Sequence, residues 1–250
     1  MIGDARLTTP WTLWGGNRLT ASVSARYDLY HFDNTEMVGG DIYSGIKNRF
    51  LPSGYLEWGL PLFKPASNWT QILEPRARIT FMRNMDKETF ALNNDSAGTI
   101  LTDSTLFSDN RFAGLDLWEN GTYADYGVRW AAFDEDGTNV EIFLGQSYDF
   151  SQRPDTDLDT GFRKGSSDYV GRVSYNNMKW LNVATRFRLN QDTLALRHME
   201  TSANIGSARN FFNVGHIWSQ HWNTELTENV NINEAIIGAG LQLTNRWSVR

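Results

Sequence analysis

The chain has 250 residues, carries a formal net charge of −6 and contains no cysteine. The lack of cysteine excludes disulfides and thiolate metal sites within the chain. The acidic balance and the absence of a long basic run argue against nucleic acid as a partner. No run of about 18 apolar residues is present, so the sequence predicts no transmembrane helix.

An alternation of apolar and polar residues with a period of two recurs along the chain. It is clear at 19–29 and again at 181–189. Successive side chains of a strand point to opposite faces, so this pattern predicts strands with one apolar and one polar face. The predicted strands are 18–30, 49–62, 70–83, 111–118, 122–133, 139–150, 168–177, 180–190, 194–205, 210–220 and 233–243, with a twelfth opening at 246.

The links between most predicted strands are short and rich in turn residues, as at 119–121 and 134–137. Asn-Gly and Asp-Gly pairs suit tight hairpins. None of the short links can hold the crossover that parallel strands need, so neighbouring strands should pair antiparallel. A strand of about ten residues, about 33 Å long and tilted by about 45°, matches the ~25 Å apolar band of outer-membrane barrels.

Three predicted connections are long, at 31–48, 84–110 and 151–167. Barrels of the outer membrane carry short turns on the periplasmic side and long loops outside. Successive antiparallel strands alternate in direction, so their connections alternate between the two sides of the membrane. Counting the strands in this way, with 111–118 as one of them, places the connection 151–167 on the outer side. The same count puts 84–110 at the periplasmic end or folded into the lumen.

The polar face of the predicted strands is unusually charged. It carries Arg26, Asp28, Glu57, Glu74, Arg76, Arg78, Asp125, Arg129, Glu141, Arg172, Arg186 and Arg188. Each unpaired charge in hydrocarbon would cost kilocalories. We expect this face to line a wide hydrated lumen, with opposite charges paired between neighbouring strands. The alternative is the exterior of a soluble sandwich, whose apolar positions would pack against a second sheet.

We therefore predict an all-β fold, an antiparallel up-and-down transmembrane β-barrel. The chain is expected to be a fragment of about 11–12 strands that forms a curved, open or imperfectly closed sheet. Aromatic residues near predicted strand ends, among them Tyr30, Trp58 and Trp180, suit membrane–water interfaces. The first residues lack the features of a signal peptide. Residues 1–250 are expected to be a single barrel-domain fragment.

An ordered series of short motifs resembles one family of proteins. It includes Leu-Glu-Pro-Arg-Ala at 73–77, Asn-Asp-Ser at 94–96, Arg-Phe-Ala-Gly-Leu-Asp at 111–116 and Leu-Gly-Gln-Ser-Tyr at 144–148. The series is similar to the barrel domain of the LPS-assembly outer-membrane protein family, LptD, also called OstA or Imp. The similarity covers 45–150 well and extends to the end of the chain as strand rhythm.

The resemblance implies a large closed barrel in the cell outer membrane that receives lipopolysaccharide (LPS) from periplasmic bridge proteins. The sugar part would pass through the lumen, and the lipid part would leave sideways into membrane lipid through a seam between the first and last strands. An LptE-like lipoprotein would plug the barrel. The chain departs from the family pattern because it has no joining cysteines. It is expected to lack the preceding jelly-roll domain and about half of the strands, so the seam strands are expected to lie outside it.

The family moves lipid and catalyses no bond chemistry, so the resemblance implies no catalytic residues and no cofactor. The residues expected to carry the family motif or to face the lumen are Glu74, Pro75, Arg76, Arg78, Asp95, Ser96, Gly145 and Gln146. Glu74 and Arg76 are interpreted as lumen-facing charges that fix strand register or contact a partner or sugar, or else as an ordinary ion-pair ladder. Pro75 cannot donate to a ladder, which implies a bulge or a local edge.

One acidic motif, at Asp155, Asp157 and Asp159, has the spacing of a calcium loop. Thr160 and Ser166 stand where that loop requires Gly and Glu, so we predict a solvated acidic loop instead. LPS assembly is the leading hypothesis. A general outer-membrane solute channel and a soluble carbohydrate-binding β-sandwich are the alternatives.

Overall fold

The computed structural model describes residues 1–36, 42–83, 100–112, 114–151, 160–207, 209–223, 228–244 and 247–249. A short 3-10 turn, η1 (Trp14–Gly16), joins the first two strands. The strands are β1 (Ile2–Thr12), β2 (Arg18–Glu36), β3 (Ile42–Gly59), β4 (Leu62–Lys64), β5 (Trp69–Met82), β6 (Gly121–Asp134), β7 (Asn139–Asp149), β8 (Gly165–Ser166), β9 (Tyr169–Asn176), β10 (Leu181–Leu189), β11 (Leu196–Gly206), β12 (Phe211–Asn223), β13 (Glu228–Gln242) and β14 (Ser248–Val249). No helix among the described residues has the length and apolar character to cross a membrane.

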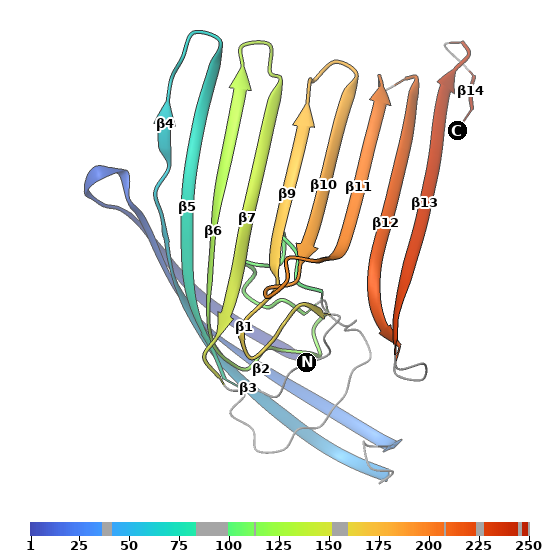
Figure 1. The fold of residues 1–250 in the computed structure, drawn as a ribbon. Helices are drawn as coiled ribbons and strands as arrows, with labels where there is room; N and C mark the ends of the chain where they lie inside the picture. The colour runs from blue at the N-terminus through green and yellow to red at the C-terminus, as the bar shows by residue number, and fades with distance from the viewer. Residues whose placement is uncertain are drawn as a thin grey trace.

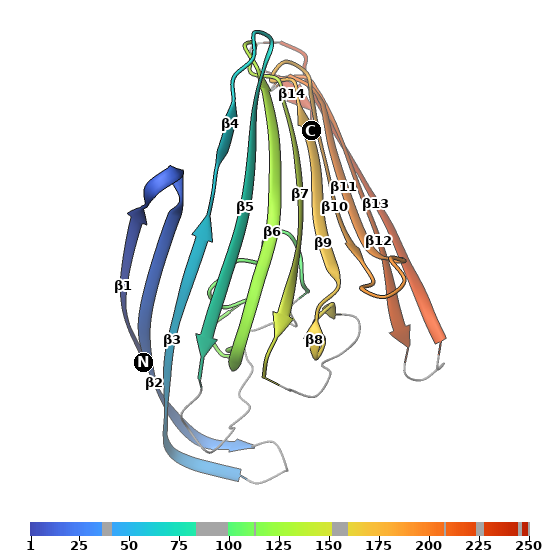
Figure 2. The ribbon, with the colours of Figure 1, turned by 60° about the vertical axis from the view of Figure 1, so that its left-hand side comes forward.

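The described strands form one antiparallel sheet whose order follows the chain. Twelve of them lie in the order β1-β2-β3-β5-β6-β7-β9-β10-β11-β12-β13-β14, while β4 pairs with β5 and β8 pairs with β7. The sheet bends around a central hollow, and its two edge strands do not pair with each other (Figures 1 and 2). The prediction of an antiparallel, curved and open barrel sheet is confirmed.

The two ends of the sheet differ in their connections. Short turns join β6 to β7, β9 to β10 and β11 to β12 at one end, which we call the turn end (Figure 1). The strands β2, β5 and β7 end, and β3, β6 and β9 begin, at the opposite end, which we call the loop end. The two long connections, from β5 to β6 and from β7 to β9, therefore start from and return to the same end, as is typical of outer-membrane barrels.

The two faces of the sheet follow the period of two in the sequence. Apolar side chains stand exposed on the outer face, and Val23 is 61% exposed. They include Leu7, Val23, Leu56, Ile79, Val128, Leu144 and Val173, which come from seven strands. In the described part of the chain no second sheet covers them, which contradicts the sandwich alternative. A face of this kind is what lipid requires of a barrel wall.

Charged side chains occupy the inner face, where neighbouring strands pair them as expected. Asp28 and Arg49 are direct cross-strand partners and are joined by an ion pair. Glu57 and Arg78 have the same relation between β3 and β5. Cross-strand pairs of opposite charge therefore support the register at two successive strand boundaries.

Three expectations about individual elements are wrong. The loop predicted at 31–48 is largely strand, because β2 continues to Glu36 and β3 begins at Ile42. The strand β1 was not predicted, because Gly, Ala and Thr make its alternation weak. The strand predicted at 111–118 is irregular chain. Without that strand the count changes, and the connection from β5 to β6 reaches the same end as 151–167.

Candidate functional site

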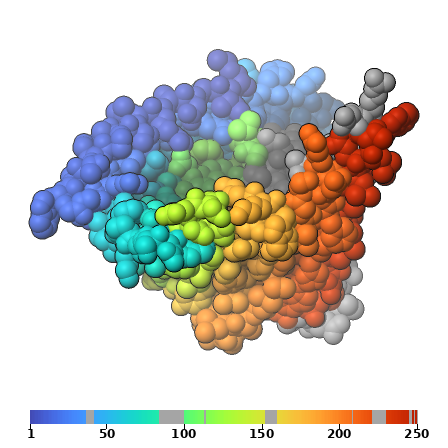
Figure 3. All heavy atoms as spheres, turned by 90° about the horizontal axis from the view of Figure 1, so that it is seen from above, coloured from blue at the N-terminus to red at the C-terminus, as the bar shows by residue number. Residues whose placement is uncertain are grey.

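The described part of the connection from β5 to β6 lies inside the curved sheet. We call residues 100–112 and 114–120 the inner segment, and Figure 3 shows the chain of this region, in green, within the hollow. A turn starts it, because the Thr102 amide donates to Oγ1 of Thr105 over 2.9 Å and the Leu106 amide donates to the Thr102 carbonyl over 3.1 Å. The segment then crosses the inner face of the sheet.

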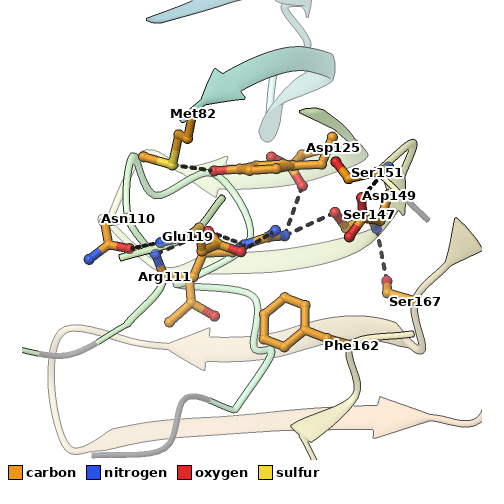
Figure 4. Close-up of polar contacts among 12 residues, drawn as sticks. Met82, Asn110, Arg111, Glu119, Asp125, Ser147, Asp149, Ser151, Phe162 and Ser167 are labelled. Carbon is orange, nitrogen blue, oxygen red and sulfur yellow. Dashed lines mark hydrogen bonds and ion pairs between the residues drawn. The ribbon is translucent and has the colours of Figure 1, made fainter. Parts of the chain in front are cut away.

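Arg111 is the buried centre of the inner segment (Figure 4). Its side chain is 2% exposed, and its Nη2 donates to Glu119 Oε1 over 2.6 Å. Its Nη1 donates to Ser147 Oγ over 2.9 Å and lies 3.4 Å from Asp125 Oδ1. Because Asp125 and Ser147 are cross-strand partners on β6 and β7, one guanidinium joins the segment to two strands of the wall.

Arg111, Glu119 and Asp125 together bring one positive and two negative groups into a buried site. One cation faces the carboxylates of Glu119 and Asp125, which are 5% and 0% exposed. Burial alone lowers the pKa of Arg111, but the two carboxylates outweigh burial and hold that pKa above its ordinary value. The guanidinium is therefore permanently charged and holds the two carboxylates together.

A second connection covers Arg111 from the other side. We call residues 160–168, which lead into β9, the covering segment. The Arg111 guanidinium carbon lies 4.0 Å from the ring centre of Tyr123 on the wall and 4.5 Å from that of Phe162 in the covering segment. The Leu101 amide also donates to the Thr160 carbonyl over 2.8 Å. The two segments thus interlock into one structure, which we call the inner layer.

Asp168 anchors the covering segment to β10. Its buried carboxylate lies 3.7 Å from Arg188 Nε and 3.6 Å from Arg163 Nε. Burial raises the pKa of Asp168 above its ordinary value, against the opposing effect of these two arginines. Gly161, with φ of +84°, lies over Arg188, and a Cβ at this position would come within 2.7 Å of Arg188 Cδ. Only glycine allows the segment to approach this closely.

Two arginines of β2 and β3 hold the other end of the inner segment. Arg26 and Arg49 both bind Asp28, and they donate to main-chain carbonyls of the segment. Arg26 Nη2 reaches the Leu115 carbonyl over 2.7 Å, and Arg49 Nη1 reaches the Asp116 carbonyl over 2.6 Å. These carbonyls bond to arginine rather than to a neighbouring strand, which explains why 111–118 forms no strand.

Aspartates of the inner segment bind arginines from strands far apart in the sheet. Asp109 pairs with Arg6 of β1 and, over 2.9 Å, with Arg78 of β5. Asp103 lies 3.5 Å from Arg172 of β9 and 3.4 Å from Arg186 of β10. The inner segment is therefore tied to the wall from β1 to β10.

A notch at Gly145 receives the apolar part of the inner segment. Gly127 and Gly145 are cross-strand partners, and a Cβ built on Gly145 would overlap Cδ2 of Leu106. The small apolar core of the inner layer consists of Leu101, Leu106, Phe143 and Val170. The missing side chain at Gly145 thus makes room for Leu106 to reach the wall, while the ring of Phe143 takes the space at Gly127.

Filling this notch should displace the inner segment. Gly145→Ala is expected to weaken the docking of residues 100–112 by about 1–3 kcal/mol, since overpacking forces Leu106 out of place. Hydrogen exchange of that segment in detergent-solubilised protein measures the effect.

Gly215→Ala is the matched control, because its added Cβ would meet Ile236 at an ordinary 3.7 Å. In a double-mutant cycle, Leu106→Ala should offset the part of the cost of Gly145→Ala that comes from Leu106, but not the part from the Tyr126 carbonyl oxygen, which would lie 2.9 Å from the added Cβ. Strictly additive costs would contradict the proposed contact.

The residues singled out from the sequence lie in three places. Arg76 donates to Glu57 Oε1 over 2.7 Å and lies over the ring of Phe107, and Arg78 binds Glu57 and Asp109. Glu74 is 3.7 Å from Arg129, and Gly145 lies under Leu106. These four residues lie on the inner face. Asp95 and Ser96 lie outside the described residues, as do Asp155, Asp157 and Asp159.

Pro75 and Gln146 carry the family motif without facing the interior. Both lie on the outer face, because their neighbours Arg76 and Ser147 point inward. Gln146 accepts a hydrogen bond from Tyr126 and donates to the Ser167 carbonyl. The pairing of β5 with β3 stops at Arg76, and pairing with β4 resumes at Leu73 in the same register. Pro75 therefore lies at a local interruption of the ladder and not at a bulge.

Sequence reasoning missed the residues at the centre of the inner layer. Arg111, Glu119 and Phe162 were not singled out as site residues, and no periodic pattern marks them. The one available signal was the Arg-Phe-Ala-Gly-Leu-Asp motif at 111–116, which was assigned to a strand.

The fold and the interior together define a class of protein. The outer face is apolar and the inner face is charged. The described parts of the long connections from one end fold into the interior that the sheet surrounds. This is the wall of a transmembrane β-barrel whose interior is occupied by its own connections.

The comparisons with known proteins identify the family. The family model described as LPS transport system D, LptD, matches residues 3–247. Proteins named "LPS-assembly protein LptD" are similar to the chain. That of Acinetobacter baumannii is 26% identical over 203 residues, covering 79% of this chain and 24% of that protein. That of Acinetobacter baylyi is 25% identical over 215 residues, covering 83% and 25%.

A third relative, from Aeromonas hydrophila, is 26% identical over 168 residues, covering 63% of this chain and 20% of that protein. The chain belongs to the LptD family. It spans about a quarter of the length of the first two relatives. It is a part of an outer-membrane β-barrel, as the resemblance implied.

Proposed function

We propose that this chain forms part of the wall of a barrel that assembles LPS at the cell surface. The sugar part of LPS would move along the charged inner face, and the lipid part would stay with the apolar outer face. The names of the relatives support this function. The separation of the two faces supports it physically, because an amphipathic glycolipid needs both environments.

The observation that carries the proposal is the inner layer at the loop end. It occupies the interior where the sugar would leave, and it is held mainly by ion pairs and one small apolar core, with strand pairing at the two residues of β8. Such contacts can be exchanged for contacts with a polar, charged substrate, so the layer would act as a seal that shifts during passage. Short turns would face the periplasm, with an LptE-like lipoprotein and periplasmic bridge proteins as partners.

Photocrosslinking in cells tests the proposal. Probes replace the inner-face residues Ser174 and Ser202 in the full-length protein, and probes at the outer-face neighbours Val173 and Ala203 are the controls. Inner-face probes should form LPS adducts that disappear when new LPS is no longer supplied. Outer-face probes should label resident membrane lipid whether or not supply continues.

An absence of LPS adducts at both inner-face positions during active supply would overturn the proposal. Ion conductance of the reconstituted full-length protein, together with that absence, would favour the solute-channel alternative instead.

A further inference from the structure

A row of five asparagines crosses the inner face near the turn end. Each pair in the row consists of direct cross-strand partners: Asn139 with Asn176, Asn176 with Asn182, Asn182 with Asn204, and Asn204 with Asn213. The row therefore runs perpendicular to the strands through β7, β9, β10, β11 and β12. Asn139, Asn176 and Asn182 lie on the same face as Glu141, Arg172 and Arg186, because each is an even number of residues from the charged residue on its own strand. Asn204 and Asn213 lie on that face too, because direct cross-strand partners share a face.

Asn139 and Asn176 bond within the hairpin turns, because Asn139 Nδ2 donates to the Gly137 carbonyl and Asn176 Oδ1 accepts from the Met178 amide. Strand formation does not explain the rest of the row. Asparagine is depleted in strands, and its short polar side chain contributes no apolar packing. Asn182 and Asn204 are exposed, so they add little burial to the sheet. Among the described residues, Oδ1 of Asn213 is buried without a hydrogen-bond partner. Asn182 and Asn204 instead present their amide groups toward the interior.

A hollow of about 240 Å³ lies beside the row at the turn end. Asn176, Asn182 and Asn204 of the row line it, together with Lys179, Trp180 and Gly206. Trp180 is 54% exposed, and its position is fixed because the Gly206 amide donates to its carbonyl over 2.7 Å. The hollow thus combines three amides of the row with an accessible aromatic ring.

The chemistry of the hollow differs from that of the inner layer. An asparagine amide offers both donors and an acceptor without a charge, which suits hydroxyl groups. An exposed indole offers a flat apolar surface and one donor, which suits the face of a sugar ring. The arginine-lined region nearer the loop end suits anionic groups instead.

We propose that the asparagine row and Trp180 form a binding site for uncharged sugar units of a glycolipid at the turn-end mouth of the barrel. This inference rests on the proposed function and names the part of the substrate that this site would hold. The site and the inner layer lie at opposite ends, so a sugar chain would meet the amides first and the arginines later.

Binding of LPS from which the fatty acids have been removed tests the inference. Isothermal titration calorimetry compares the detergent-solubilised full-length protein with the double variant Asn182→Val/Asn204→Val and with Trp180→Ala. Each variant is expected to bind at least tenfold more weakly. The matched control is Thr185→Val/Thr201→Val, a cross-strand pair on the outer face of the same two strands, which should bind as the unmodified protein does.

The inference would be overturned if the unmodified protein showed no saturable binding. It would equally be overturned if the double asparagine variant bound with the same affinity as the threonine control. A photocrosslinking probe at Asn182 that labels a protein and no sugar would also overturn it, since the row would then be a polypeptide contact. If probes at Ser174 and Ser202 form LPS adducts but the unmodified protein shows no saturable binding in calorimetry, the site at the asparagine row is refuted and the proposed function is not. If probes at Ser174 and Ser202 form no LPS adducts, the proposed function is refuted.

Discussion

Replacing Arg111 by methionine is expected to release the inner layer from the wall. The change leaves Glu119 and Asp125 buried without their cation, and removal of one partner of a buried ion pair costs about 3–5 kcal/mol. The loss should appear as faster hydrogen exchange of residues 100–112 and 160–168 in detergent-solubilised protein. The strands themselves should keep their protection, because Arg111 makes no ladder hydrogen bond.

Arg186→Met is the matched control for this prediction. Arg186 also binds an aspartate of the inner segment, but its side chain is 36% exposed, so its loss should cost about 1 kcal/mol or less. The triple variant Arg111→Met/Glu119→Gln/Asp125→Asn removes the buried charges together and should recover much of the protection. Equal exchange in Arg111→Met and Arg186→Met would contradict the central role of Arg111.

Placing an arginine at Val128 is expected to destabilise the barrel in lipid. Val128 is exposed on the outer face near the middle of β6. An arginine at the bilayer midplane of a barrel wall costs about 2–4 kcal/mol, and the cost falls to about 0–1 kcal/mol near the interfaces. Reversible unfolding of the full-length protein in lipid vesicles measures the difference.

Tyr148→Arg provides the depth control for Val128→Arg. Tyr148 lies on the same face of the neighbouring strand, close to the loop end of β7. Its replacement should cost much less if the outer face meets lipid. Similar costs at the two positions would indicate that Val128 does not lie in hydrocarbon.

The strands could be predicted from the sequence where one face meets lipid and the other meets charges. The alternation around Val128 and Arg129 is strong, and the predicted strand 122–133 corresponds to β6. The first strand has Gly3, Ala5 and Thr9 at outward positions, so its alternation is weak. This strand forms because every residue from Ile2 to Thr12 has a pairing partner on β2. That pairing leaves no recognisable pattern in the sequence of β1 itself.

The inner layer could not be predicted because its contacts follow no period. Arg111 is recognised by Glu119, Ser147 and Asp125, which lie at unrelated distances along the chain. In such a segment the backbone carbonyls accept hydrogen bonds from side chains of the wall, as the carbonyls of Leu115 and Asp116 do from Arg26 and Arg49. The motif residues Arg76 and Arg78 were predicted to point inward, but their partners in the inner segment only became visible in three dimensions.

The interlocked contacts of the inner layer also bear on how the sheet folds. Hairpins such as β6–β7 close short loops and can form early, whereas Arg49 and Asp116 lie 67 residues apart and can meet only later. A slip of β7 by one residue would turn Ser147 outward and Gln146 inward, which removes the hydroxyl that Arg111 needs. The inner layer can therefore close only over a correctly registered sheet, so its late docking selects the correct pairing during folding.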